Sequence, residues 1–170
     1  VEHPEAFRTL LSAFADVVRD SLAYQLEQGA DVVQLFDTYA AALSPEDYRE
    51  FVLPLHREIL ADLSVPSIVF VRRMGGRLDL LAESGADVVG LDWTVEMDHA
   101  RETLGDRPVQ GNLDPSYLFG SPAFIRAETE RIVEAAGPAG HILNLGHGVH
   151  SETPVEGVRA FVETAKSIER

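Results

Sequence analysis

Apolar and polar residues follow two alternating patterns along this chain. Residues 4–29 place apolar side chains mostly three or four positions apart, at Leu10, Phe14, Val17, Val18, Leu22 and Leu26. That spacing predicts an amphipathic helix, and Gly29 is a stop signal because glycine tolerates the left-handed conformation that often ends helices. The next apolar run, at 31–37, is short and predicts a strand.

A second helix is expected over residues 44–63. Ser44 suits the N-cap, Pro45 suits the first helical position, and acidic residues follow in the first turn. Pro54 lies inside this segment and has no backbone N–H, so we expect it to kink or interrupt the helix.

The alternation of strand and helix patterns continues to the end of the chain. Further strands are expected at 67–71, 87–92, 108–113 and 141–145, and further helices at about 78–83, 95–104, 123–135 and 154–168. Several of these strands are nearly continuous apolar runs, as in parallel sheets that are covered on both faces. Such a repeat predicts either a doubly wound sheet or a (β/α)8 barrel.

Residues able to do chemistry follow the predicted strands at their carboxyl ends: Asp37-Thr38, Arg72-Arg73, Asp92-Trp93, Asn112 with Asp114, and His147. In parallel α/β folds this edge binds ligands. No GxGxxG sequence follows a strand, so a dinucleotide-binding sheet would lack its phosphate loop. We therefore predict a parallel (β/α)8 TIM barrel, present as a partial barrel of about five βα units. Residues 1–170 would form the C-terminal portion of one domain, with about three units upstream, in agreement with the absent initiating Met.

Composition narrows the classes of function. The 28 acidic residues outnumber the 14 basic ones and give a net charge of −14, which argues against nucleic acid as a partner. Cysteine is absent, which excludes disulfides and thiolate metal sites. No membrane span and no signal peptide is recognisable, so we expect a cytoplasmic protein without membrane contact. Lys166 is the single lysine, and this acidic composition suggests a salt-loving host.

Four sequence blocks together resemble a known family. QLFDTYAAALSPEDYREFVLP at 34–54, and then GADVVGLDWTV, QGNLDP and NLGHG, are similar in order and spacing to blocks of the uroporphyrinogen decarboxylase family. The resemblance covers residues 6–167. It implies a (β/α)8 barrel, a homodimer and a carboxy-lyase that uses no cofactor. The implied reaction removes CO2 from the four acetate side chains of uroporphyrinogen and gives coproporphyrinogen, a step of haem and tetrapyrrole biosynthesis.

The resemblance also implies roles for particular residues. The family's catalytic aspartate, arginine pair and tyrosine fall in blocks before this chain begins, so we predict no catalytic residue and no metal ligand within it. Three substrate-binding residues carry over. They are Thr38, the hydroxyl residue of LFDT; His147, the NLGHG histidine that contacts a substrate carboxylate; and Phe36, an aromatic residue that lines the cleft. The sequence VFVRRMGG, with Arg72 and Arg73, departs from the family pattern, which carries fewer charges there.

The acidic and amide residues near the predicted edge also have structural interpretations. Asp37 would repel a substrate rich in carboxylates, so we expect it to face a cation or backbone donors. We expect Asp92-Trp93 to serve as a cap and a space-filling ring. Asn112 and Asp114 suit a turn after their strand, because such side chains bond nearby backbone, and Asn112 is also a candidate for contact with the cleft.

Two further histidines and the Arg72-Arg73 pair lead to further expectations. His141 should lie at the opposite rim and be structural, whereas His150 is a candidate for a second substrate contact. Because adjacent residues of a strand point in opposite directions, at most one of Arg72 and Arg73 is expected to enter the cleft.

Two other interpretations stay open. The corrinoid- and thiol-directed methyltransferases share this barrel but activate thiols with a zinc site of His and Cys ligands, and this chain has no Cys. Alternatively, the chain is a folding module or half of an assembled barrel, with no activity of its own. Open sheet edges beside its first and last strands would then favour self-association or pairing with the other half.

Overall fold

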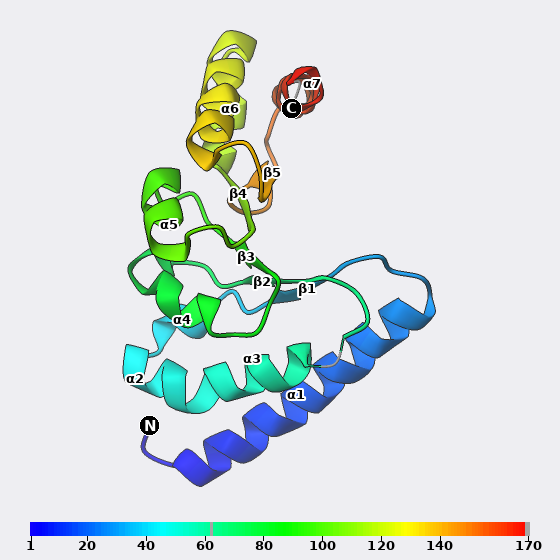
Figure 1. The fold of residues 1–170 in the computed structure, drawn as a ribbon, viewed down its shortest axis with the longest axis vertical. Helices are drawn as coiled ribbons and strands as arrows, with labels where there is room; N and C mark the ends of the chain where they lie inside the picture. The colour runs from blue at the N-terminus through cyan, green and yellow to red at the C-terminus, as the bar shows by residue number, and fades with distance from the viewer. Residues whose placement is uncertain (62, 169–170) are drawn as a thin grey trace. The chain divides into compact units, whose positions relative to one another are not determined.

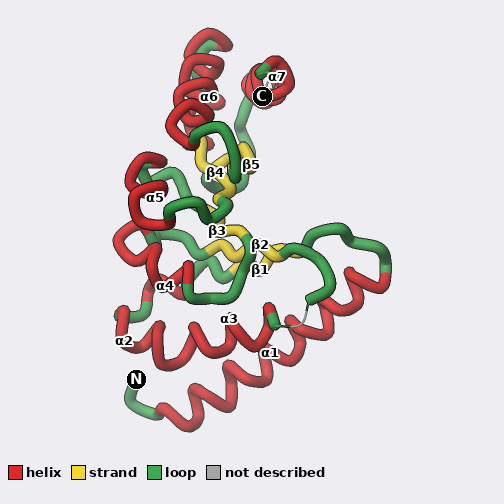
Figure 2. The backbone as a smooth tube through the Cα atoms, in the orientation of Figure 1, coloured by secondary structure: helices red, strands yellow, loops and turns green. Residues whose placement is uncertain are grey.

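The computed structural model describes residues 1–61 and 63–168, in which strands and helices alternate (Figures 1 and 2). The strands found there are β1 (Val33–Phe36), β2 (Ser67–Phe70), β3 (Val88–Gly90), β4 (Val109–Leu113) and β5 (His141–Leu145). The helices are α1 (Pro4–Glu27), α2 (Pro45–Asp47), α3 (Leu53–Leu60), α4 (Leu78–Ala82), α5 (Met97–Leu104), α6 (Pro122–Ala136) and α7 (Val155–Ser167). Each predicted strand is therefore confirmed, and a helix follows each one.

The chain forms two compact units, Val1–Val89 and Gly90–Arg170. In both units neighbouring strands follow chain order, and the pairs β1–β2 and β4–β5 are parallel. None of the helices within the described residues is long and apolar enough to cross a membrane.

In the first unit, α1 packs along α3 (Figure 1). Ala15 and Leu22 are the buried residues of α1. Leu10, Phe14 and Val17, which the spacing assigns to the same apolar face, are instead 53%, 60% and 65% exposed. The reason is that α1 touches its unit along a narrow line, and apolar residues outnumber the positions on that line.

The segment from Ser44 to Leu60 is the helix that the capping signals predict. The Ser44 hydroxyl accepts a hydrogen bond from the Asp47 backbone N–H at 3.0 Å, and Pro45 occupies the first turn. The interruption expected from Pro54 is present as a wide π-helical turn at Tyr48–Val52, between α2 and α3. Proline lacks the N–H that a regular α-helix would use here, and the wide turn accommodates that loss.

The second unit packs α6 against α7 and α5. Ser121 caps α6, and Ile125 and Ile132 on its inner face are buried. Helix α7 comes so close to the turn at Pro115–Phe119 that a Cβ on Gly157 would lie 1.9 Å from the Leu118 carbonyl oxygen. Only a glycine permits this approach of two backbones.

Candidate functional site

The carboxyl ends of β1 and β2 form the first candidate edge. The two strands are parallel, with Phe36 opposite Phe70, and the Asp37 N–H donates to the Phe70 carbonyl at 2.9 Å. Thr38 and Arg72 each lie two residues beyond these paired strand ends. The structure therefore brings the family-like LFDT block and the unusual arginine pair to the same place.

Thr38 lines a hollow of about 280 Å³, called here the Thr38 hollow, whose lining residues are Thr38, Tyr39, Ala41, Ala42, Arg72 and Arg73. Thr38 and Arg72 are half-buried, whereas Arg73 is exposed. Among the described residues, those that line this hollow include no carboxylate. Its surface therefore combines a hydroxyl, a phenol and two permanent positive charges, which is the chemistry of an anion site.

Both arginines line the same hollow, which differs from the expectation that at most one would enter a cleft. Strand β2 ends at Phe70, so the alternation of side chains along a strand no longer applies at residues 72 and 73. Arg73 has a positive φ of 65°, and the chain turns at this point. The turn, rather than the pleat, sets the direction of the second arginine.

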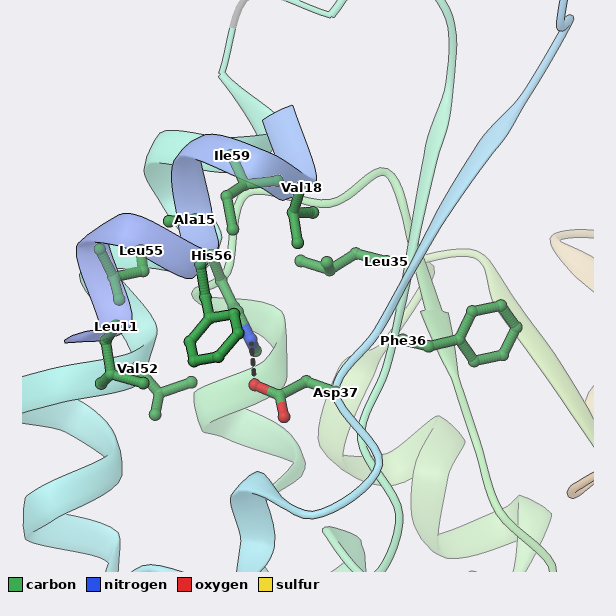
Figure 3. A pocket seen from close by; sticks show the side chains of 11 residues that line it. Leu11, Ala15, Val18, Leu35, Phe36, Asp37, Val52, Leu55, His56 and Ile59 are labelled. Atoms are coloured by element: carbon green, nitrogen blue, oxygen red, sulfur yellow. Dashed lines mark hydrogen bonds and ion pairs between the residues drawn. The ribbon is translucent and has the colours of Figure 1, made fainter. Parts of the chain in front are cut away.

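Asp37 is turned toward His56 on α3, as Figure 3 shows. The His56 Nε2 atom lies 3.0 Å from Asp37 Oδ2, and His56 Nδ1 lies 3.2 Å from the hydroxyl of Tyr48. Burial, reinforced by the Asp37 carboxylate, raises the pKa of Tyr48 well above its usual 10.0. The phenol therefore keeps its proton and can donate it to Nδ1, which leaves Nε2–H to donate to Asp37.

Asp37 was expected to face a cation or backbone donors, and its carboxylate instead faces the side chain of His56. Sequence reasoning identified neither His56 nor Tyr48. Both rings are buried, at 2% and 0% exposure. His56 lines a mostly apolar hollow of about 250 Å³ between α1, α3 and β1 (Figure 3). The only signal in the sequence was a histidine on the inward face of a helix, which by itself does not reveal its partner.

Phe36 lies on the opposite side of β1 from Leu35 (Figure 3). Its ring is 66% exposed and meets Phe70 edge to face, with 6.0 Å between the ring centroids. An exposed aromatic ring held in place by a second ring offers a flat apolar surface to a ligand.

His147 belongs to the second unit, just beyond β5. Its ring is half-buried and lies 6.0 Å from the ring of Trp93, tilted by 52°. The Gly148 N–H donates to His147 Nδ1 at 2.6 Å. Since Nδ1 accepts this bond, the hydrogen of the neutral ring lies on Nε2, and Nε2–H is the atom that can donate to a carboxylate.

The two glycines that flank His147 have different roles. A Cβ on Gly146 would lie 2.3 Å from the Trp93 backbone nitrogen, so the backbone at 92–93 requires glycine here. A Cβ on Gly148 would meet nothing within 4 Å. The first glycine therefore fixes the position of the histidine against the β3–α5 loop, and the second leaves space in front of the ring.

The turn residues of the second unit are structural. Asp92 accepts hydrogen bonds from the backbone and the hydroxyl of Thr94, and Asp114 accepts one from the Ser116 N–H at 2.8 Å. Asn112 lies within β4, not in a turn after it. Its buried amide donates to the carbonyls of residues 92 and 95, at 2.9 and 2.6 Å. These two hydrogen bonds hold the β3–α5 loop, which contacts Gly146.

Two further histidines, His141 and His150, also differ from each other. His141 begins β5 and its Nε2 lies 2.6 Å from the Gly111 carbonyl, which agrees with the expected structural role. His150 is exposed and its ring lies 6.0 Å from that of Phe119. Within the described part of the chain, no three histidine or carboxylate side chains form a group that could hold a metal ion.

Comparisons with known proteins agree on one family. The family model described as "Uroporphyrinogen decarboxylase (URO-D)" matches residues 1–168. A protein named uroporphyrinogen decarboxylase from Gloeobacter violaceus is 47% identical over 97% of this chain, and one from Carboxydothermus hydrogenoformans is 45% identical over 98%. The chain spans about half the length of these curated relatives, 49% in both cases.

Solved structures show the same fold at low sequence identity. A methyltransferase from Methanosarcina mazei superposes with a TM-score of 0.74 at 23% identity, covering 83% of this chain and 43% of that one. A B12-independent methionine synthase from Shewanella sp. W3-18-1 gives 0.69 at 11% identity, covering 90% and 51%. These matches, each to about half of a TIM-barrel enzyme, confirm the predicted fold class.

Proposed function

Because this chain belongs to the uroporphyrinogen decarboxylase family, we propose that it contributes the C-terminal half of the substrate-binding barrel of a uroporphyrinogen decarboxylase. The observation that carries the proposal is the match over residues 1–168 to the family, with relatives of that name near 45% identity over nearly the whole chain. The protein would act in the cytoplasm on an octacarboxylate tetrapyrrole, as a homodimer and without a cofactor.

In the proposed reaction each acetate arm loses CO2. A pyrrole ring protonated on carbon takes up the electron pair of the breaking C–C bond, and a proton then adds to the methylene carbon to give a methyl group. The residues of this chain bind rather than transfer protons. The Thr38 hydroxyl and His147 Nε2–H donate to substrate carboxylates, and Phe36 contacts the apolar ring system.

The geometry supports these binding roles within each unit. Thr38 lines a hollow that carries two arginines, and the neighbouring Asp37 carboxylate is engaged by His56. The Gly148 N–H and the Trp93 ring hold His147 in one tautomer and orientation. Both arrangements supply hydrogen-bond donors of the kind that bind carboxylates.

The test is anaerobic decarboxylation of uroporphyrinogen by a chimera in which the N-terminal half of the Gloeobacter violaceus relative precedes residues 1–170. We expect activity from the chimera and none from the 170-residue chain alone. His147→Ala and Thr38→Val should each lower kcat/KM by about ten- to a hundredfold, the usual range for a lost hydrogen bond to a charged group. The matched control His99→Ala replaces an exposed histidine of α5 and should leave activity unchanged.

A folded chimera without activity would contradict the proposal. Full activity in both site variants would instead contradict the binding roles of Thr38 and His147 while leaving the reaction in place. Thr38→Ser separates the two effects at that position, because serine keeps the hydroxyl and should keep most of the activity.

A further inference from the structure

We propose that Thr38, Arg72 and Arg73 form a subsite that binds one carboxylate side chain of the tetrapyrrole. The identity of the ligand rests on the proposed function, whereas the chemistry of the subsite rests on the Thr38 hollow itself. The evidence comes from the charges that line the hollow, from the way its walls are held, and from the backbone at Arg73.

The charged side chains that line the hollow are all positive. In a chain of net charge −14, two arginines gather in the Thr38 hollow, and none of its described lining residues is acidic. The nearest carboxylate along the chain, Asp37, is held by His56 through a 3.0 Å contact. A carboxylate that enters the hollow therefore meets two guanidinium groups and a hydroxyl.

A third arginine holds the wall of the hollow. Arg77 donates from Nη1 to the Leu43 carbonyl at 2.9 Å and from Nη2 to the Ala41 carbonyl at 2.8 Å. These bonds fix the segment that carries Ala41 and Ala42 against the turn that carries Arg72 and Arg73. One arginine thus holds the wall of the hollow and two others line it, which gives the subsite a defined shape.

The backbone of Arg73 adds a separate observation. Its φ of 65° makes it the one non-glycine residue with positive φ in the described part of the chain. Left-handed backbone disfavours L-residues with side chains and persists mainly where function or packing requires it. The Arg73 side chain is exposed, so burial of this side chain is not what holds the conformation. Glycine would take this conformation without strain, and two glycines follow at 75 and 76, yet the position carries arginine.

The hollow is large enough for a carboxylate side chain but too small for a whole macrocycle. A space of about 280 Å³ is at the lower end of small-molecule sites, so the ring system would lie outside it. The paired arginines suit a planar carboxylate because guanidinium groups bind it through two parallel hydrogen bonds. The subsite would bind either a carboxylate side chain distant from the reacting carbon or the acetate side chain that reacts.

The test measures binding of uroporphyrin I, an octacarboxylate, and of propionate to the 170-residue chain. Uroporphyrin I is followed by fluorescence titration, and propionate by NMR of the arginine Nε–H signals. Arg72→Gln and Arg73→Gln should each weaken uroporphyrin binding about tenfold. Arg49→Gln removes the same charge from an exposed position outside the hollow and should change binding less than twofold. Arg73→Gly should weaken binding as much as Arg73→Gln while folding at least as stably as the unchanged chain.

The outcomes separate this inference from the proposed function. Propionate shifts at Arg72 and Arg73 without any uroporphyrin binding would support the carboxylate subsite and count against the tetrapyrrole. Equal shifts by phosphate would overturn the selectivity for carboxylate. Wild-type binding by both glutamine variants, or no response to either carboxylate, would overturn the subsite. The same variants in the chimera give a second readout, an approximately tenfold higher KM for uroporphyrinogen with little change in kcat.

Discussion

Replacing Gly146 by alanine tests how the histidine of NLGHG is held. The new Cβ would lie 2.3 Å from the Trp93 nitrogen and 2.9 Å from the Asp92 carbonyl carbon, whereas ordinary contacts begin near 3.4 Å. The backbone at 92–93 must therefore move by about 1 Å. A rigid neighbour cannot rotate aside, so the cost lies at the upper end of overpacking penalties, about 3 kcal/mol.

Gly148→Ala is the matched control, two residues along the same segment. Its Cβ meets nothing within 4 Å, and its φ lies outside the left-handed region, so we expect a change within about 0.5 kcal/mol. Thermal unfolding followed by circular dichroism measures both variants. For a chain of this size, about 3 kcal/mol lowers the Tm by roughly 6–12 °C, and the control should stay within about 2 °C. Equal Tm values for the two variants would refute the reasoning.

Three other predictions concern stability. In the folded protein, burial raises the pKa of Tyr48, whereas in the unfolded protein the phenol ionises above pH 10. The free energy of unfolding should therefore fall above pH 10, by up to about 1.4 kcal/mol per pH unit. Urea unfolding between pH 9 and 11 should show this decline in the Tyr24→Phe variant but not in Tyr48→Phe. The same dependence of the unfolding free energy on pH in both variants would contradict the prediction. Asn112→Asp sets a buried carboxylate against two carbonyls and should cost about 3 kcal/mol by urea unfolding, while exposed Asn144→Asp should cost little. Finally, a net charge of −14 predicts a higher Tm in molar KCl than in dilute buffer, and equal melting curves would disprove the salt-loving interpretation.

Much of the fold could be predicted because its signals are local. Apolar runs marked all five strands found in the described residues, and Ser44 and Pro54 marked the start and the interruption of a helix. The exposure of Leu10, Phe14 and Val17 could not be predicted. Spacing tells which residues share a helix face, but it does not tell how wide a contact that face makes.

The candidate site was predictable to a smaller extent. Thr38 and His147 follow their strands as the motifs suggest, and their substrate contacts stay predictions. The joint position of Arg72 and Arg73 depends on where β2 ends and on a left-handed residue, which no local pattern indicates. Likewise, Asn112 was expected in a turn because local sequence patterns do not reveal its hydrogen-bond partners, which are backbone carbonyls 17 and 20 residues away.

The wide turn at Tyr48–Val52 has a consequence for insertions and deletions. Tyr48 and His56 are eight residues apart, and eight α-helical steps of about 100° would leave them about 80° apart around the axis. A π-helical turn absorbs one extra residue, so the two rings differ by about seven steps and fall within about 20° of one face. Inserting one more residue in 49–52 would leave the rings about eight steps apart and rotate Tyr48 away from His56 by about a quarter turn, whereas deleting one would restore a regular helix and keep them seven steps apart, near one face. For the Tyr48–His56 contact, this segment therefore tolerates a one-residue deletion but not a one-residue insertion.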